Sequence, residues 1–216
     1  MARPDFRRNL AALQDDLILM GSMVDKAIAH SVIALRDRDV ESARRTIRED
    51  DLIDSKRLEI EEHCAEIIAT QAPVASDLRM LLAVFAITGE LERIGDYAEG
   101  ISKIAVMMGE EPPLKPLVDI PLMAEQGRRM LRDSLDALVR RDPTLARAVK
   151  QADDEVDRLY DVVYRDLLGY MINDPKTIER ATHLLWVAHN LERIADRATN
   201  VAERAIFMIT GDIHAR

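Results

Sequence analysis

Cysteine, glycine, proline and aromatic residues are all scarce in this sequence. Its single cysteine, Cys64, excludes an intrachain disulfide and a thiolate metal cage, and we interpret it as a small buried apolar side chain. Gly and Pro number 8 each and aromatic residues make up 4%, whereas Ala, Leu, Arg and Glu are abundant. This composition favours helices over strands, so we predict an all-α protein.

Positive charge and long apolar runs are also limited. Lys and Arg total 30 against 39 Asp and Glu, a net charge of −9 with no basic run, which argues against a nucleic-acid-binding protein. Uncharged stretches such as Met80 to Gly89 are too short to span a bilayer. We therefore expect a cytoplasmic protein that approaches a membrane only indirectly, through its partners.

The apolar pattern predicts six long antiparallel helices. Apolar residues between Phe6 and Ala27 recur at alternating spacings of four and three, which is typical of an amphipathic helix. We expect the first three helices over residues 6–36, 40–70 and 76–108. The second should end ahead of Pro73, because proline disfavours helix in the residue before it. Three more helices should follow, separated at residues 142–143 and 173–175.

The two halves of the chain repeat each other. At an offset of 103, nine residues between Ala34 and Asp54 recur, and at an offset of 100 the sequence LERIGD at Leu91–Asp96 returns as LERIAD at Leu191–Asp196. We therefore predict two tandem three-helix bundles. Their expected extents are residues 1–109 and 117–216, joined by a Pro-rich linker at residues 110–116.

Acidic residues spaced i, i+4 fall inside the repeated segments. The pairs are Asp50/Asp54, Glu92/Asp96, Asp153/Asp157 and Glu192/Asp196. With 39 acidic residues some such pairs occur by chance, and the ordinary explanation for each is a solvated helix face. Like charges at this spacing destabilise a helix by about a few tenths of a kcal/mol, so their repetition asks for a cause.

The position of these acidic pairs within each hairpin suggests why they are repeated. Asp50 and Asp96 both lie 23 residues from position 73, where the second and third helices are joined. Asp54 and Glu92 both lie 19 residues from it, and the second-half pairs are related in the same way about residues 174–175. Because every helix rises equally per residue, each half should hold four carboxylates at one level. Glu92 and Asp96 point away from the apolar stripe of their helix, and Asp50 and Asp54 lie on the shoulder of theirs, which predicts an outer groove rather than the core.

Four converging carboxylates repel one another unless cations neutralise them. Hard oxygen ligands suit Mg²⁺, Mn²⁺, Ca²⁺ or iron, and an open groove has room for more than one ion. The pattern also allows two causes without metal: Arg93 and Arg193 could neutralise the neighbouring acids, and shared ancestry could preserve the pairs. The alternative is then a metal-independent helical scaffold that binds partners through its grooves.

Enzymatic functions find no support in the residue pattern. A carboxylate-bridged di-iron oxidase needs Glu-x-x-His on core-facing helices, and none of the 5 histidines has a glutamate three residues before it. No Ser/His/Asp triad or activated cysteine can be argued from the spacing. No Gly-rich phosphate-binding loop is present either, so direct sensing of phosphate is not expected. We predict that the chain is not an enzyme.

The segments LERIGDYA and LERIADRATN, in the third helix of each half, resemble the PhoU family of bacterial phosphate-signalling regulators. The resemblance covers nearly the whole chain and includes its length, duplication and helix order. It implies a non-enzymatic adaptor that represses the phosphate-starvation response when phosphate is plentiful. Its implied partners are the ATPase subunit of the phosphate ABC transporter, a phosphate sensor histidine kinase and a second copy of the chain in a homodimer.

The resemblance also implies metal ions, because some PhoU proteins carry multinuclear clusters on these motifs. Iron, manganese, magnesium or zinc are the implied metals. The implied ligands are Asp50, Asp54, Glu92, Asp96, Asp153, Asp157, Glu192 and Asp196. Glu99 and Glu203 are possible outer ligands, and His189 is either a further ligand or, as we favour, a surface histidine. Asn200 fits the family motif but position 100 is Gly, so the two halves need not bind metal equally.

Overall fold

The computed structural model describes residues 3–212, and their side chains from Phe6 onward. This part of the chain contains six α-helices, one short 3-10 helix and no strand. The elements are α1 (Arg3–Asp37), α2 (Val40–Gln71), α3 (Ser76–Met108), α4 (Asp119–Arg140), α5 (Pro143–Asn173), η1 (Pro175–Thr177) and α6 (Ile178–Thr210). The predicted all-α fold and helix order are confirmed. The outermost ends of the two predicted units, residues 1–2 and 213–216, lie outside the described residues.

The sequence repeat extends to the turns that begin the second helix of each half. Asp39 caps α2 by accepting a hydrogen bond from the Ser42 N–H, and Asp142 caps α5 by accepting from the Thr144 and Leu145 N–H groups. The residue before each cap, Arg38 or Arg141, has a positive φ, of 60° and 53° respectively. The same tight connection is therefore used in both halves.

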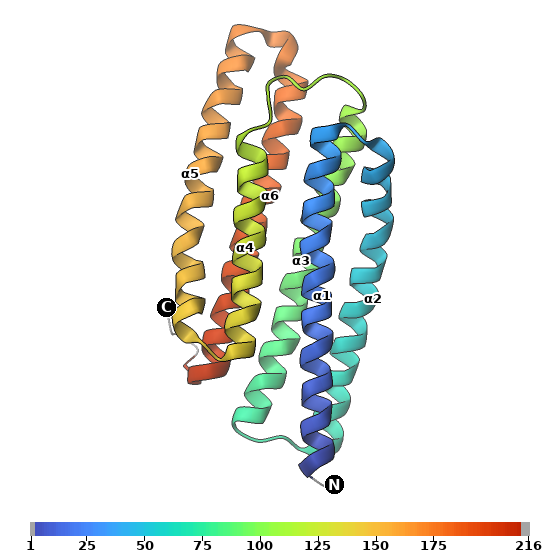
Figure 1. Cartoon of the computed structure of the whole chain (residues 1–216), viewed down its shortest axis with the longest axis vertical. Helices are drawn as coiled ribbons and strands as arrows, with labels where there is room; N and C mark the ends of the chain where they lie inside the picture. Colours follow the sequence, from blue (N-terminus) through green and yellow to red (C-terminus); the bar gives the residue numbers. More distant parts are fainter. Residues whose placement is uncertain (1–2, 213–216) are drawn as a thin grey trace.

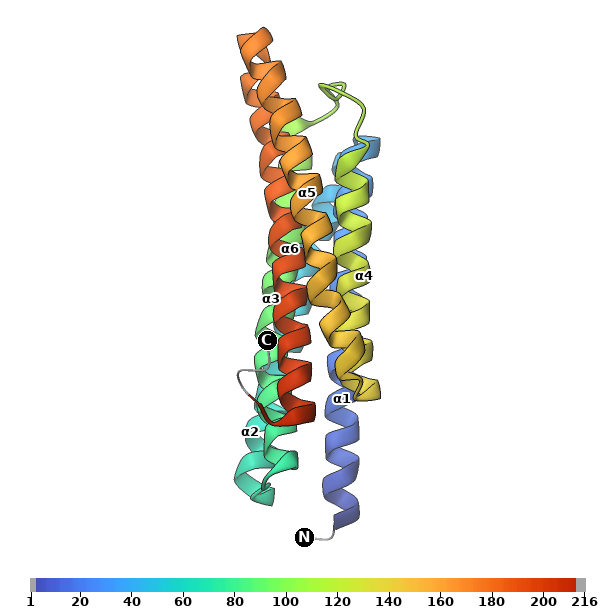
Figure 2. The ribbon, with the colours of Figure 1, turned by 90° about the vertical axis from the view of Figure 1, so that its left-hand side faces the viewer.

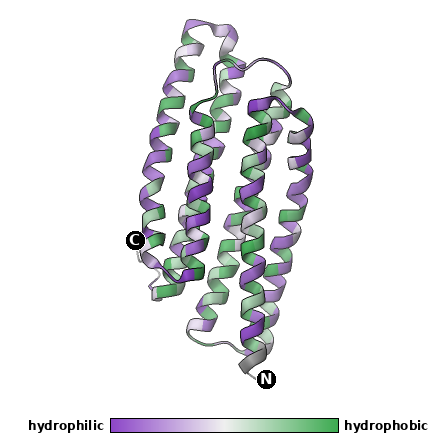
Figure 3. Ribbon diagram, viewed as in Figure 1, coloured by the Kyte–Doolittle hydropathy of each residue, from purple (hydrophilic) through white to green (hydrophobic). Residues whose placement is uncertain are grey.

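Each half forms a three-helix bundle, and the two bundles lie side by side (Figure 1). Two helix pairs join them: α1 packs against α4, and α3 packs against α6, while α2 and α5 flank the assembly. Figure 2 shows α1 and α4 on one side of the molecule, with α3 and α6 on the other. Hydrophobic residues follow the inward sides of the helices and hydrophilic residues the outer sides (Figure 3).

The buried apolar residues form one core that continues through both bundles. At the contact between the bundles Gly21 of α1 lies directly against Leu135 of α4, and a Cβ atom on Gly21 would overlap Leu135 Cδ1. Cys64 is fully buried, as expected, and burial raises the pKa of its thiol to about 12. It therefore behaves as a small apolar core residue.

The central pair of helices, α3 and α6, runs antiparallel. Asn200 of α6 contacts Glu90 near the middle of α3, whereas Asn190 lies against Gly100 further along α3. In these two contacts a higher residue number in α3 goes with a lower residue number in α6. The motif LERIGD of α3 and the motif LERIAD of α6 therefore cross at about the same level. The acidic residues of both halves therefore gather around the middle of the molecule.

Among the described residues, the segment Phe6–Asp37 of α1 is the only helical stretch long and apolar enough to cross a membrane. Its apolar side chains line the core of the first bundle. Those with no exposed surface are Leu13, Leu17, Met20, Val24 and Ile28. Packing within the bundle thus accounts for part of the hydropathy of α1, whose Ile18, Leu19 and Ile33 side chains are exposed.

The connection between the bundles, residues 109–118, is tied to the second half by polar contacts. Lys115 forms ion pairs with Asp119, at 3.6 Å, and with Asp166 of α5. The Arg180 guanidinium of α6 donates to the carbonyl oxygen of Pro112. The irregular segment thus includes the whole of the predicted linker, whose role as a domain boundary stays a prediction.

Candidate metal-binding clusters

The first acidic cluster lies between α2 and α3. Asp50 and Asp54 come from α2, Glu92 and Asp96 from α3, and all four side chains reach the surface. Partial burial, together with the charges of Glu99, Asp96 and Asp54, raises the pKa of Asp50 to about 7. The carboxylates are therefore close enough to destabilise one another's ionised form, as their common level predicted.

The remaining groups of this cluster show the same crowding. Burial first, then the charges of Asp96 and Asp54, raises the pKa of Glu92. Burial, Asp54 and Glu99 likewise raise the pKa of Asp96. The Arg57 guanidinium opposes both shifts without cancelling them, so excess negative charge remains in the groove.

The second cluster lies between α5 and α6. Partial burial and the charges of Asp157, Asp196 and Glu192 raise the pKa of Asp153 to about 6. The pKa of Asp157 is raised by burial and by Asp196, and that of Glu192 by burial, Asp196 and Asp157. Structure and sequence agree that each half gathers its four acids at its surface.

The donor chemistry suits hard cations, but the observed side-chain positions do not form a finished cage. Within residues 6–212, no group of three or more His, Cys, Asp or Glu side chains is arranged to hold a metal ion. Carboxylate side chains on exposed helix faces rotate readily, and Mg²⁺ sites commonly retain several waters. The eight residues remain the predicted ligands.

Gly95 explains how Asp50 comes so near α3. A Cβ atom on Gly95 would lie 3.1 Å from Asp50 Oδ1 and 3.3 Å from Ile53 Cδ1. The missing side chain lets α2 place a carboxylate over the backbone of α3. The second half has Ala195 at this position. The glycine in LERIGD was visible in the sequence, but its role depends on the approach of a second helix.

The arginines that follow the motif glutamates act differently in the two halves. Arg193 forms an ion pair with Asp196 at 2.9 Å, so it neutralises part of the second cluster. Arg93 pairs instead with Glu90 at 3.0 Å. Local neutralisation, one of the alternatives open from the sequence, therefore operates in part in both clusters, because the charges of Arg93 and Arg193 also oppose the rise in the pKa of Glu92 and Glu192.

The expected outer ligands also differ. The charge of Glu99 reaches Asp50 and Asp96, which places it beside the first cluster, although it also pairs with Lys103 at 2.5 Å. Glu203 pairs with Lys150 at 2.8 Å. His189 Nδ1 lies 3.6 Å from Glu192 Oε2, and the imidazole is part-exposed. The histidine is thus at the edge of the second cluster.

A polar seam, which the sequence did not predict, separates the two clusters. Its centre is Glu90 of α3, whose carboxylate accepts hydrogen bonds from Arg93, from Arg197 at 3.3 Å and from Asn200 at 2.9 Å. Arg197 and Asn200 belong to α6, so the seam joins the two halves. Asn200 is therefore engaged by the first half.

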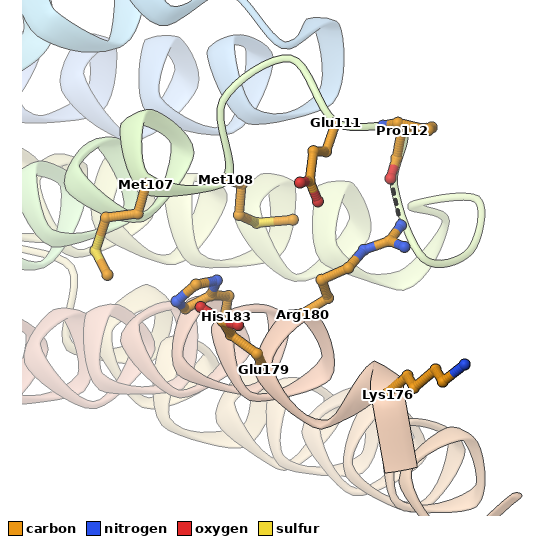
Figure 4. A pocket seen from close by; sticks show the side chains of 8 residues that line it. All are labelled: Met107, Met108, Glu111, Pro112, Lys176, Glu179, Arg180 and His183. Carbon is orange, nitrogen blue, oxygen red and sulfur yellow. Dashed lines mark hydrogen bonds between the residues drawn. The ribbon is translucent and has the colours of Figure 1, made fainter. Parts of the chain in front are cut away.

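A cavity lies away from both clusters, where the linker meets α3 and α6 (Figure 4). It has a volume of about 280 Å³ and its walls include Met108, Glu111 and His183. Arg180 turns toward Pro112, and Lys176 points outward (Figure 4). Cationic and anionic groups line it together, so its charge favours no particular ligand.

Comparison with known proteins agrees with this architecture. A family model described as the PhoU domain matches residues 17–105 and again residues 120–205. The chain belongs to the PhoU family. PhoU proteins are accessory and regulatory proteins rather than enzymes, so the prediction of a non-enzymatic chain is confirmed.

Individual PhoU relatives match along nearly their whole length. A phosphate-specific transport system accessory protein PhoU homolog of Aquifex aeolicus is 42% identical over 206 residues, covering 95% of this chain and 93% of the relative. The crystal structure of PhoU from Pseudomonas aeruginosa superposes with a TM-score of 0.91 at 36% identity, covering 96% of this chain and all of the other. The crystal structure of the phosphate transport system regulatory protein PhoU from Streptococcus pneumoniae superposes with a TM-score of 0.90 at 27% identity, covering 98% of this chain and all of the other.

Proposed function

We propose that this chain is an accessory protein of phosphate transport that represses the phosphate-starvation response when phosphate is plentiful. In this role it couples the ATPase subunit of the phosphate ABC transporter to a phosphate sensor histidine kinase. Membership of the PhoU family supports the accessory role. It acts in the cytoplasm, reaches the membrane through these partners and is a homodimer. Exposed apolar side chains such as Leu19 and Leu52 offer surface for self-association.

We further propose that the two acidic clusters bind metal ions, with Asp50, Asp54, Glu92 and Asp96 as ligands in the first half. Asp153, Asp157, Glu192 and Asp196 serve in the second. The observation that carries this proposal is the crowding of part-buried carboxylates in each groove: burial first, and then the charges of the neighbouring acids, raises the pKa of Asp50 to about 7 and of Asp153 to about 6. A bound cation would relieve that repulsion. Iron, manganese, magnesium and zinc are the candidate metals, and each groove can hold more than one ion.

Metal analysis tests the ligand assignment. The protein is stripped with a chelator, reloaded with each candidate metal, desalted and analysed by plasma mass spectrometry. Glu92→Ala/Asp96→Ala should lose the metal of the first half, and Glu192→Ala/Asp196→Ala that of the second. The matched control is Glu62→Ala/Glu66→Ala, an exposed i, i+4 pair on α2 outside the cluster. Equal metal content in all four proteins would show that the assignment is wrong.

Co-purification tests the adaptor role. The tagged chain should recover the transporter ATPase subunit or the sensor kinase to an extent that depends on phosphate supply. Association that persists unchanged in both double cluster variants and in chelator would favour the metal-independent scaffold. Absence of association at both high and low phosphate would rule out the adaptor.

A further inference from the structure

Four ring-bearing side chains form a row across the outside of α5 and α6. We define this aromatic row as Tyr164, Tyr160, His189 and Trp186. Successive ring centroids are 6.5, 6.4 and 5.7 Å apart, and the indole meets the imidazole edge to face. Trp186 is 56% exposed and Tyr164 44%. Large aromatic surfaces left in water commonly mark recognition sites.

The row is bordered by carboxylates. His189 lies 3.6 Å from Glu192, and the charges of Glu192 and Asp161 both act on Tyr160. Asp157 is one helical turn before Tyr160 on α5. Exposed ring faces beside negative charge form a surface that attracts cations, because the ring quadrupole and the carboxylates act in the same direction.

In the first half, the chain itself supplies a cation at the positions that correspond to the aromatic row. The repeat aligns Tyr160 with Arg57 and Tyr164 with Glu61, and it aligns Trp186 and His189 with Ala86 and Gly89. There the Arg57 guanidinium pairs with Glu61 at 3.5 Å and lies close enough to Glu92 to oppose the rise in its pKa. The first half thus supplies an internal guanidinium next to its cluster, whereas the second half supplies rings.

The cations near the row are already paired with acids, and one of these acids, Asp161, also borders the row. Arg193 pairs with Asp196 at 2.9 Å and interacts with Tyr97. Arg197, although its charge also reaches Glu192, donates to Glu90 of the first half. On α5, Arg158 and Arg165 pair with acids of their own helix, and these acids are Glu155 and Asp161.

We propose that the aromatic row is a docking surface for arginine side chains of a partner protein. A guanidinium from the partner would stack on the exposed rings and approach Glu192, taking the role that Arg57 has beside Glu92. Arginine suits this surface better than lysine because its planar, weakly hydrated cation stacks on aromatic faces. The bordering carboxylates disfavour an anionic lipid surface. The proposal does not depend on metal binding.

Trp186 is the only tryptophan of the chain, so its fluorescence reports on the row directly. The full-length protein, kept in chelator, is titrated with a blocked peptide of alternating arginine and glycine. The reference titration uses the same peptide with citrulline, which has the shape of arginine without its charge. We expect saturable binding of the arginine peptide and at least roughly tenfold weaker binding of the citrulline peptide.

Two tyrosine variants separate stacking from general attraction to an acidic protein. Tyr164→Ala should weaken binding of the arginine peptide roughly three- to tenfold. Tyr170→Ala, an exposed tyrosine of the same helix outside the row, should bind as wild type. Circular dichroism of both variants checks that they fold. Equal affinity of wild type and Tyr164→Ala, or equal losses in both variants, would overturn the proposal. So would binding to phosphatidylcholine vesicles without binding to the peptide, which would make the row a membrane contact.

Discussion

Asn200 donates a hydrogen bond of 2.9 Å to the carboxylate of Glu90, across the contact between the two halves. The same carboxylate accepts from Arg197 of α6, and the two side chains of this ion pair are only 14% and 18% exposed. The acidic clusters flank this seam, one in each half. The seam therefore fixes how the two candidate metal sites face relative to one another.

Removal of the Glu90 carboxylate should weaken the joined bundles. Glu90→Ala leaves Arg197 and Asn200 without their acceptor at a part-buried interface, so we expect the free energy of unfolding to fall by about 1–3 kcal/mol. Urea denaturation followed by circular dichroism measures the change. Glu62→Ala, at an exposed position of α2, should stay within about 0.5 kcal/mol of wild type. A similar loss in both variants would contradict the role of the seam.

Two glycines of α3 should differ in their response to alanine. Apart from its chain neighbours and the backbone of its own helix, nothing lies within 4 Å of the position that a Cβ atom would take on Gly89, so Gly89→Ala should stabilise the helix by about 0.5–1 kcal/mol. Gly95→Ala should stabilise the protein less, because the new Cβ atom would press on Asp50 and Ile53. The displaced Asp50 carboxylate should then show a lower pKa, which NMR titration can follow. An unchanged pKa in Gly95→Ala would mean that this glycine does not set the position of Asp50.

The metal-free protein should lose stability as the pH rises from about 4 to about 7. Asp50 and Asp153 have raised pKa values of about 7 and about 6, so the folded state binds more protons than the unfolded state in this window. Their contribution to the stability of the folded protein is complete below the pKa of the unfolded state and is lost as the pH rises through the pKa of the folded state. Solvent screening limits it to on the order of 1 kcal/mol per group.

A comparison of variants isolates that contribution from other titrations. Asp50→Asn should flatten the dependence of unfolding free energy on pH between about 4 and 7, since its side chain cannot ionise. Asp51→Asn, at the exposed neighbouring position, should keep the wild-type slope. If both variants follow wild type, crowding within the first cluster is weaker than the structure indicates.

The close approach of α1 and α4 should make Gly21 intolerant of a side chain. A Cβ atom there would overlap Leu135, so Gly21→Ala should lower the free energy of unfolding by about 1–3 kcal/mol. Leu135→Ala should also destabilise the protein. The free energy of unfolding of the double variant should fall by less than the sum of the two single decreases, because each change makes room for the other. Strict additivity in this double-mutant cycle would show that the two residues do not press on each other.

The sequence predicted the levels of the acidic residues because helix rise is constant, so counting from the turn at Pro73 places Asp50 opposite Asp96. It could not predict the seam. Glu90 looks like an ordinary surface residue, and Asn200 stands out only as a member of the family motif, until the packing of α3 against α6 brings the two together. The aromatic row is different, because it lies within the α5–α6 hairpin: Tyr160 and His189 are equally far from the turn at residues 174–175, so the same counting places them at one level. Contacts within a hairpin follow from spacing, whereas contacts between bundles require the orientation of one bundle on the other.

The antiparallel crossing of α3 and α6 gives the molecule two contacts related by an approximate two-fold axis. One joins Glu90 to Asn200, and the other sets Gly100 against Asn190. In a protein assembled from two copies of the first half, Glu would face Gly at both contacts. In one assembled from two copies of the second half, Asn would face Asn at both. Only two halves of different sequence can hold a charged hydrogen bond on one side of the axis and a close helix approach on the other. Neither half is therefore interchangeable with its twin, and an ancestor with identical subunits could not have had this interface.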